Sequence, residues 1–336
     1  MNKIKKLVED RQPIKYYLSN YGIWLAAVIL VAVFSIFSKN FLSAQNLVNL
    51  LRQTSIIGIV TMGTAMIIIT GGIDLSSGSM VGFTACIAAQ FALKSVDLLF
   101  VVPLIIGIAV GTGLGFANGF VIAKGKVPPF IVTLGMMSIA RGAILVVNEG
   151  RPISHFTDSF NSIGATNLIT IEMSNNVGAV ISQPILPLIT LIFIGIVTLT
   201  WYFLKYLKFG REVYAIGDNE GAAEVSGIKT IWTKIRVYTL AGAFTGLAGV
   251  LWASRMQAAT SSAATGYELD AIAGAVVGGC SLSGGTGKVN GIILGIFVLS
   301  IITNGLDMLG VSPYYQAIIK GMVIVFAVWL DSRKTI

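Results

Sequence analysis

Residues 98–123 read LLFVVPLIIGIAVGTGLGFANGFVIA, and this stretch contains no charged residue. A helix needs about 20 apolar residues to cross the hydrocarbon core of a bilayer, so the stretch is long enough to span it. Nine other runs are predominantly apolar, the last two of them shorter or broken: 21–38, 55–70, 77–92, 130–147, 185–204, 237–252, 289–302, 269–277 and 317–330. Backbone groups in lipid must be hydrogen-bonded within the protein, and alternation typical of strands is scarce, so these runs predict helices. The sequence therefore predicts an all-α fold: a polytopic integral membrane helical bundle, with about ten transmembrane helices in a single domain over 1–336.

The distribution of charge predicts the orientation of the bundle. Charged residues make up 11% of the chain, against roughly 25% in a typical soluble domain, and the formal net charge is +8. With the N-terminus inside, the predicted cytoplasmic segments hold most of the Lys and Arg residues. The opposite face holds only Lys39, Arg52, Lys94, Arg151 and Arg255. This asymmetry predicts that both termini are cytoplasmic, and it explains the basic balance without nucleic-acid binding.

The same topology assigns a side of the membrane to three segments. Residues 1–20 are predicted to form a cytoplasmic N-terminal segment, 149–183 an extracytoplasmic loop and 207–234 a cytoplasmic loop. The single histidine, His155, lies in the extracytoplasmic loop and is interpreted as a surface residue.

Two connections in the chain share a pattern. Residues 118–137 read NGFVIAKGKVPPFIVTLGMM, and residues 304–322 read NGLDMLGVSPYYQAIIKGM. Both run from Asn-Gly at the end of a span through a glycine, a proline and an aromatic residue into a new span with Gly-Met. The predicted topology puts the first connection in the cytoplasm and the second outside. Five helices per half would then form an inverted internal repeat, an arrangement found in many transporters.

A polar break interrupts the apolar sequence at residues 70–79, TGGIDLSSGS. The glycines permit a turn, and the hydroxyls and the carboxylate can satisfy the freed amides. One interpretation is a tight connection at the membrane edge, with Asp74 or Ser76 capping the next helix. The other is a broken helix at depth that lines a substrate path. Both interpretations remain open at this point.

The sequence shows no pattern typical of an enzyme. Residues 277–288, VGGCSLSGGTGK, superficially resemble a phosphate-binding loop, but the motif needs Gly, four residues, then Gly-Lys-Ser/Thr. Leu282 stands at the first glycine position and Val289 at the hydroxyl position. No metal-ligand spacing or nucleophile motif is present either. We therefore expect no ATPase site, no metal site and no bound cofactor in this chain, and we interpret Cys86 and Cys280 as small packing residues.

Residues 214–230, YAIGDNEGAAEVSGIKT, form a short polar segment in the largest cytoplasmic loop. Asp218 or Asn219 suits the N-cap of a helix, Glu220 suits its positive end, and Gly227 suits a left-handed stop. About two turns of helix are predicted. The segment is either a solvated linker or a docking helix for a cytoplasmic partner. Since the chain looks like a transporter without an ATP site, the partner would be an ATPase on a separate polypeptide.

At these residues the chain resembles a known family. The loop YAIGDNEGAAEVSGI resembles the coupling loop of permease subunits of bacterial ABC sugar importers, in the ribose and galactoside group. The break GGIDLSSGS resembles a signature of that family, and residues 265–291 and 304–331 resemble its C-terminal third almost continuously. GYELDAIA and the YYQ after Pro313 are most similar to ribose permeases. Asp218 stands where the family has a second glycine, and Gly221 places a flexible residue in the coupling helix.

The resemblance implies a set of partners. It implies a homodimer, or a pair with a close paralogue, in the bacterial plasma (inner) membrane, with one translocation path at the subunit interface. It also implies an extracytoplasmic sugar-binding protein and a cytoplasmic ATP-binding subunit that would hydrolyse the ATP. Ribose is the leading sugar, ahead of galactosides and other monosaccharides.

The resemblance also implies roles for particular residues. Movement of the ATPase would reach this chain through a set of coupling residues: Asn219, Glu220, Ala222, Ala223, Ser226 and Gly227. Intramembrane polar residues supply the candidates for the substrate path: Asp74, Ser76, Ser77, Asn118 and Asn304. For each of these five, helix capping or interhelical hydrogen bonding is an alternative role.

A self-contained secondary transporter, driven by an ion gradient, is the alternative function. It would need a site for the coupling ion, and a pair of intramembrane carboxylates would be its signature. Asp74 stands nearly alone in the sequence, which counts against this alternative.

Overall fold

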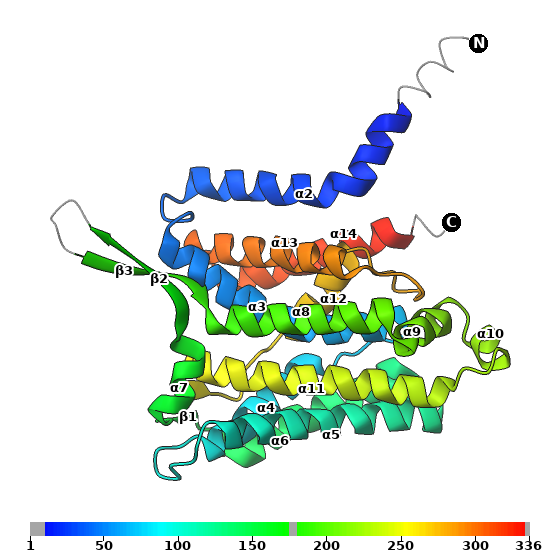
Figure 1. Cartoon of the computed structure of the whole chain (residues 1–336), viewed down its shortest axis with the longest axis horizontal. Coiled ribbons are helices and arrows are strands. Elements are labelled where there is room, and N and C mark those ends of the chain that lie inside the picture. Colours follow the sequence, from blue (N-terminus) through cyan, green and yellow to red (C-terminus); the bar gives the residue numbers. More distant parts are fainter. Residues whose placement is uncertain (1–10, 175–179, 333–336) are drawn as a thin grey trace.

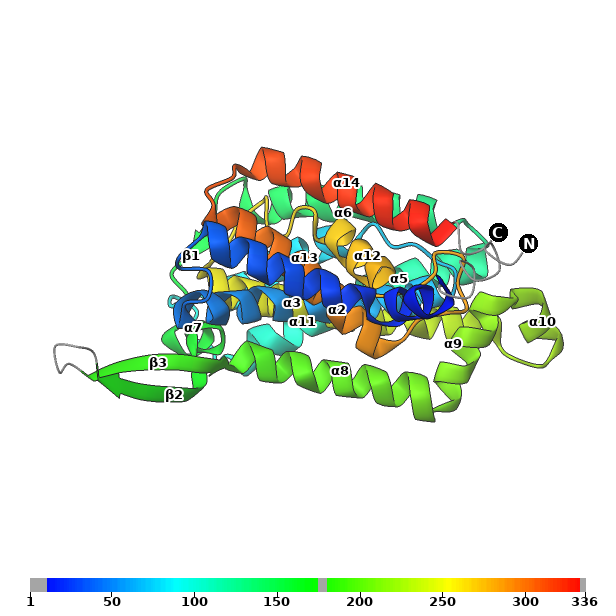
Figure 2. The same ribbon diagram turned by 90° about the horizontal axis from the view of Figure 1, so that it is seen from above.

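The structure is a computed structural model, and it describes residues 11–174 and 180–332. The helices are α2 (Arg11–Phe37), α3 (Ala44–Ile69), α4 (Ser77–Phe91), α5 (Val101–Gly125), α6 (Pro129–Asn148), α7 (Asp158–Ala165), α8 (Leu188–Tyr206), α9 (Lys208–Asp218), α10 (Glu220–Val225), α11 (Thr230–Met256), α12 (Tyr267–Val277), α13 (Val289–Met308) and α14 (Pro313–Ser332). The strands are β1 (Ile153–Ser154), β2 (Asn167–Ser174), β3 (Val180–Pro187) and β4 (Ala258–Ala259). The long helices run side by side along one direction (Figures 1 and 2).

Each of the apolar runs in the sequence overlaps one of these helices. In the described part of the chain, six helices are long and apolar enough to cross a membrane: α3, α5, α6, α8, α11 and α13. The apolar part of α2, Gly22–Phe37, is shorter. Helices α4 and α12 have 15 and 11 residues. At a rise of 1.5 Å per residue they are only about 22 and about 16 Å long, so each extends through part of a bilayer.

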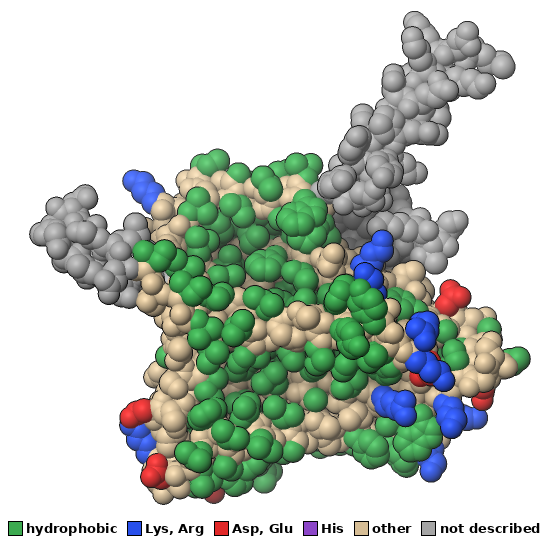
Figure 3. Space-filling view, viewed as in Figure 1, with side chains coloured by type: hydrophobic (Ala, Val, Ile, Leu, Met, Phe, Trp, Pro, Cys, Tyr) green, Lys and Arg blue, Asp and Glu red, His purple; other side chains and the backbone are tan. Residues whose placement is uncertain are grey.

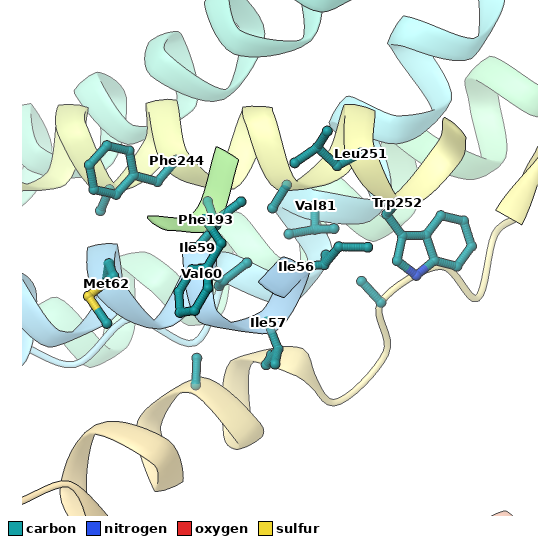
Figure 4. Packing of buried hydrophobic residues seen from close by; sticks show 14 of the residues in the cluster. Ile56, Ile57, Ile59, Val60, Met62, Val81, Phe193, Phe244, Leu251 and Trp252 are labelled. Carbon is teal, nitrogen blue, oxygen red and sulfur yellow. The ribbon is translucent and has the colours of Figure 1, made fainter. Parts of the chain in front are cut away.

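Helices α3 and α11 lie at the centre of the bundle and are buried over most of their length. Their apolar side chains meet in the core, with Ile59 and Val60 of α3 near Phe244 and Leu251 of α11 (Figure 4). Phe193 of α8 packs on α3 and covers Gly58, where a Cβ would collide with its ring. The outer helices α5, α6 and α8 bury much less of their surface.

Helix α11 approaches α5 closely because glycines face each other across the contact. A Cβ on Gly111 would collide with the carbonyl oxygen of Gly242, and a Cβ on Gly246 would collide with that of Gly107. Small residues at such positions let the backbones of two membrane helices come together. The spacing of four residues between Gly107, Gly111 and Gly115 therefore sets the face of α5 that packs on α11.

The two central helices each pack against short and long helices from the other part of the sequence. Helix α3 contacts α12 and α13, whereas α11 contacts α4 and α5. The connection from α5 to α6 and the connection from α13 to α14 lie at opposite ends of the bundle (Figures 1 and 2).

The bundle has two chemically different ends. The start of α2, the end of α14 and helices α9 and α10 lie at one end, and the β2–β3 hairpin lies at the other (Figures 1 and 2). On the face shown in Figure 3, most Lys and Arg side chains gather at the α9–α10 end, and hydrophobic side chains cover the middle. This is the arrangement that the charge distribution in the sequence predicts.

The predicted loop at residues 149–183 contains regular structure that the sequence analysis did not foresee. Strand β1 pairs with β4, and β2 pairs with β3 in an antiparallel hairpin. Thr157 caps α7 by accepting a hydrogen bond from the Phe160 amide. The fold is thus a helical bundle with a small β-hairpin rather than helices alone. Part of this loop, 175–179, and the first half of the predicted 1–20 segment, 1–10, lie outside the described residues.

Candidate functional site

The break after α3 brings three of the predicted substrate-path residues together. Asp74 is buried, and its Oδ1 accepts hydrogen bonds from the Ser76 amide at 2.7 Å and from Ser76 Oγ at 2.5 Å. Asn118 of α5 donates from Nδ2 to Ser76 Oγ at 3.0 Å. Gly71, with φ of +78°, makes the turn that the glycine-rich sequence indicates. Asp74, Ser76 and Asn118 therefore form one buried polar cluster, which we call the α3–α4 cluster.

The hydrogen bonds of the α3–α4 cluster resemble those of a capping turn. The bond from the Ser76 amide to Asp74 closes a local turn immediately before α4, with Ser76 at the N-cap position. Thr133 of α6 donates to the Ile73 carbonyl at 3.3 Å, so the break is also held by a neighbouring helix. Ser76 makes no side-chain cap to α4, and Gly78 in the first turn of α4 lies against Glu268 of α12, so both interpretations of the 70–79 segment stay open.

Several polar atoms near the α3–α4 cluster have no hydrogen-bond partner. They are Asn118 Oδ1, Ser77 Oγ and Tyr238 Oη, all buried. Tyr238 of α11 lies beside the break, because a Cβ on Gly72 would come within 2.6 Å of its Oη. Buried polar groups normally find partners, so these atoms are available to hydrogen-bond water or a passing polar group.

Asn304 lies apart from the other predicted path residues. Its side chain exchanges two hydrogen bonds with Asn46 of α3, each at 2.9 Å. Asn46 also donates to the Phe41 carbonyl at 2.8 Å. Both asparagines are buried beside a small apolar cluster that includes Phe34 and Phe41. The structure thus links α3 to α13 through this amide pair.

The structure reveals a second group of charged residues inside the bundle that the sequence analysis missed. Lys320 of α14 pairs with Asp270 of α12, with Nζ and Oδ2 2.8 Å apart. Glu268, also in the first turn of α12, lies close enough to Arg141 of α6 for electrostatic attraction. Glu268 and Asp270 both lie in the GYELDAIA segment, so the sequence did contain a signal for these two carboxylates. Asp74 is therefore not the nearly isolated intramembrane carboxylate that the sequence analysis assumed. In the described part of the chain, no three His, Cys, Asp or Glu side chains form a metal-binding group.

The predicted short helix in the cytoplasmic loop is confirmed as α10. Asn219 caps it, because its Oδ1 accepts a hydrogen bond from the Ala222 amide at 2.9 Å. Gly227, with φ of +83°, follows its end in the left-handed region. Ser226 donates from Oγ to the Ala222 carbonyl at 2.8 Å. The preceding helix α9 was not predicted.

Helix α10 has an exposed surface, and an ion pair with α11 fixes the helix to the bundle. Among the predicted coupling residues, Ala223 is buried, while Asn219, Glu220, Ala222, Ser226 and Gly227 are exposed. Glu220 pairs with Lys234 of α11, with Oε2 and Nζ 2.6 Å apart. Val225 projects furthest, with 91% of its surface exposed. An exposed helix with small residues and a fully exposed valine is a surface that a partner can contact.

Helix α9 connects α10 to the core of the bundle. A Cβ on Gly217 would collide with the Ile69 carbonyl at the end of α3 and with the Gly285 amide. The Gly285 amide itself donates to that carbonyl at 2.9 Å. Tyr214 donates from its hydroxyl to the Gly287 carbonyl at 2.7 Å, and burial raises the pKa of this phenol, which keeps the donor protonated. The glycine-rich segment 278–288 thus lies between α9 and α3.

Apolar spans, two short buried helices and an exposed polar helix at one end together define a polytopic helical membrane protein. The family described as "Branched-chain amino acid transport system / permease component" matches residues 46–328. The ribose import permease protein of Bacillus subtilis (strain 168) is 38% identical over 99% of each chain. That of Escherichia coli (strain K12) is 39% identical over 95% of this chain and 96% of its own. The galactose/methyl galactoside import permease protein of the same strain is 37% identical over 95% of each chain.

This chain belongs to the branched-chain amino acid transport system/permease component family. It is accordingly a transport component and a multi-pass inner-membrane protein. No solved structure matches it.

Proposed function

We propose that this chain is the membrane-spanning permease subunit of an ATP-binding-cassette importer that carries a monosaccharide, ribose, into the cytoplasm. The observation that carries the proposal is the similarity to ribose import permease proteins over nearly the whole chain, including the α9–α10 segment. A separate ATPase drives transport, and an extracytoplasmic binding protein supplies the sugar. In this proposal the ATPase site lies on the separate subunit, and no cofactor is expected in this chain.

We propose a topology with about ten spans, both termini cytoplasmic and an inverted repeat of five helices per half. The contacts between the two halves support the repeat. Helix α3 of the first half packs on α12 and α13 of the second, just as α11 of the second half packs on α4 and α5 of the first. The short helices α4 and α12 hold corresponding places in the two halves. The basic end of the bundle, with α9 and α10, is the cytoplasmic end in this proposal. Two copies of the chain form the translocation path between them.

The contacts of α9 support a route for coupling. Closure of the ATPase moves α10, and α10 is fixed to α11 through the Glu220–Lys234 pair. Helix α9 then transmits the movement to the end of α3 and to the 278–288 segment, which it touches through Gly217 and Tyr214. The coupling residues Asn219, Glu220, Ala222, Ala223, Ser226 and Gly227 keep this role as a proposal.

The substrate-path roles of Asp74, Ser76, Ser77, Asn118 and Asn304 also stay predictions. The unpaired atoms near the α3–α4 cluster support transient contact with sugar hydroxyls there. Sites along a path must bind weakly enough to release the substrate. Asn304, already paired with Asn46, is the least available of the five.

We would test the function by measuring ATP hydrolysis in proteoliposomes that contain the chain with the ATPase and binding protein encoded beside it. We expect ribose to stimulate hydrolysis several-fold more than galactose. Glu220→Arg should abolish most of the stimulation, because it reverses the charge on the exposed surface of α10. Ribose uptake that ran without the ATPase and followed an ion gradient would instead support the secondary transporter.

A charge swap separates docking from local structure in this assay. Glu220→Lys combined with Lys234→Glu restores the ion pair between α10 and α11 but keeps the surface charge of residue 220 reversed. We expect the double variant to fold, as judged by a single size-exclusion peak, and to remain uncoupled. Recovery of stimulation would show that Glu220 acts only by fixing α10, and a direct docking role would be wrong.

A further inference from the structure

Charged side chains from three helices meet at the first turn of α12. Asp270 pairs with Lys320 of α14 at 2.8 Å. Arg141 of α6 donates to the Ala263 carbonyl at 2.8 Å, in the segment that leads into α12. Helices α6 and α14 therefore flank the start of α12 and supply one cation each.

Glu268 is held in this group without a complete set of partners. Its Oε2 is buried and has no hydrogen-bond partner. The same oxygen lies against the first turn of α4, because a Cβ on Gly78 would collide with it. Burial of a charged atom without a partner is costly, so the atom is suited to a group that arrives transiently.

The Asp270–Lys320 pair is only partly buried. The side chains of Lys320 and Asp270 are 25% and 17% exposed. Ionisable residues in membrane segments rarely face lipid and instead face water or protein. On the same helix, Ile318, Met322 and Val325 are much more exposed and apolar, and they suit contact with lipid or with another helix. We therefore expect the Lys320 side of α14 to face water rather than lipid.

Asp270 also lines a small cavity whose walls are partly polar and partly apolar. Its volume is about 20 Å³, which is room for one water-sized group. The polar members of its lining are Gln53, Tyr267, Asp270, Ser300 and Thr303. Asp270 is thus partly exposed and is one of several polar groups around a recess with room for a single hydroxyl.

We propose that the first turn of α12 lines the route of the sugar, with Asp270 and Lys320 as its polar contacts. The ligand class is a neutral polyhydroxyl molecule: a hydroxyl donates to the Asp270 carboxylate, and another accepts from the Lys320 ammonium as the ion pair opens. Charge-assisted hydrogen bonds give such contacts strength, and closure of the ion pair afterwards releases the sugar. This inference rests on the proposed function and adds residues to it that the sequence analysis did not select.

Cysteine accessibility tests whether this turn faces water. Lys320→Cys is made with Cys86→Ala and Cys280→Ala, and a membrane-impermeant methanethiosulfonate reagent is added outside cells. We expect it to react roughly tenfold or more faster than the matched control Met322→Cys, two residues away on the apolar side of α14, since an apolar environment suppresses the reactive thiolate. Equal rates would overturn the inference.

A second variant covers the case in which loss of Lys320 disturbs folding. Leu269→Cys lies in the same turn of α12, is 48% exposed and leaves the ion pair intact. We expect the impermeant reagent to label it, and ribose with its binding protein to slow the labelling. Without sugar, the labelling rates of Lys320→Cys and Leu269→Cys do not depend on what the chain transports. If the reagent labels neither cysteine, this inference is wrong. The proposed function is still decided separately, by ribose-stimulated ATP hydrolysis.

A pair of charge-removal variants distinguishes sugar contact from a structural clamp. Asp270→Asn leaves Lys320 unpaired, whereas Asp270→Asn with Lys320→Gln leaves no unpaired charge. We expect the double variant to be as stable as the wild type but to transport ribose at roughly a tenth of its rate, as for a loss of about 1.4 kcal/mol. Wild-type transport by the double variant would show that the pair only clamps α12 to α14.

Discussion

Asn46 and Asn304 illustrate how single polar residues join distant parts of this membrane protein. Their amides exchange two hydrogen bonds across the contact between α3 and α13, and both are buried. In an apolar surrounding, each amide satisfies the other, and removal of one leaves the other without its partner. This pairing accounts for Asn304 without any contact with a substrate.

The first prediction concerns this amide pair. Asn304→Leu should lower the free energy of unfolding by about 1–3 kcal/mol, because the Asn46 Oδ1 stays buried without a donor while its Nδ2 keeps only the Phe41 carbonyl. Asn46→Leu with Asn304→Leu should recover most of that loss. Thermal unfolding of detergent-purified protein would measure both effects.

The same variants test the path role of Asn304. If the double variant is stable and transports ribose normally, Asn304 is a structural link. A stable double variant without transport would restore the earlier prediction that Asn304 contacts the sugar. Additive losses in the two single variants would mean that the amides are not coupled.

Residues with local signals could be predicted from the sequence, and residues with distant partners could not. The cap of α10 by Asn219 and the stop at Gly227 depend on neighbours within a few positions, so the sequence indicates them directly. Asn46 lies 258 residues from Asn304, and Asp270 lies 50 from Lys320. No local pattern specifies which polar residue at such a distance is the partner.

At the scale of elements, the contact between α5 and α11 depends on glycines rather than on large apolar side chains. Gly107, Gly111 and Gly115 allow the backbones to touch, and Gly242 and Gly246 complete the contact. Without these glycines the two helices would have to separate by the thickness of a side chain. The separation would disturb α4 as well, which packs on both.

The second prediction uses two glycines on the same helix. Gly111→Ala should destabilise the protein by about 1–3 kcal/mol, because the new methyl group collides with backbone atoms of α11. Gly113→Ala should be neutral or stabilising, because nothing lies within 4 Å of its added Cβ and alanine favours a helix. Thermal unfolding in detergent measures both. Equal effects of the two substitutions on stability would mean that α5 and α11 are not in close contact.

The apolar helices could be predicted from the sequence, but the β2–β3 hairpin and helix α9 could not. Each apolar run overlaps one helix because burial in lipid demands an internally hydrogen-bonded segment. The hairpin of β2 and β3 escaped prediction because it lies in a polar loop that was read by composition and charge. Helix α9 escaped because its polar sequence lacks an apolar run, and tertiary contacts through Gly210 and Gly217 hold it.

At the scale of the whole molecule, the two ends of the bundle differ in charge and in structure. Basic residues gather around α9 and α10, and the hairpin projects from the opposite end (Figures 1 and 3). A helical bundle with this asymmetry inserts with its basic end toward the cytoplasm. The asymmetry of charge could be predicted from the sequence because it depends on many Lys and Arg residues rather than on any one contact, while the orientation itself stays a prediction.

The third prediction tests that orientation. Leu168→Cys in β2 and Val225→Cys in α10 both expose their side chains, at 47% and 91% for the native residues. In the Cys86→Ala and Cys280→Ala background, an impermeant maleimide should label Leu168→Cys in intact cells and Val225→Cys only after permeabilisation. The reverse pattern would place α10 outside and remove the basis for coupling to a cytoplasmic ATPase.

The exchange of contacts between the two parts of the chain has a consequence for biogenesis. Helix α3 emerges from the ribosome early, yet its partners α12 and α13 are made near the end of synthesis. At about 5–20 residues per second, the 258 residues between Asn46 and Asn304 take on the order of ten seconds to a minute to appear. During that interval the Asn46 amide lacks its partner on α13, and the glycine face of α5 lacks its own partner until α11 has been made. The nascent first half must therefore be sheltered by the insertion machinery, or remain loosely associated, until the last helices arrive and lock the bundle.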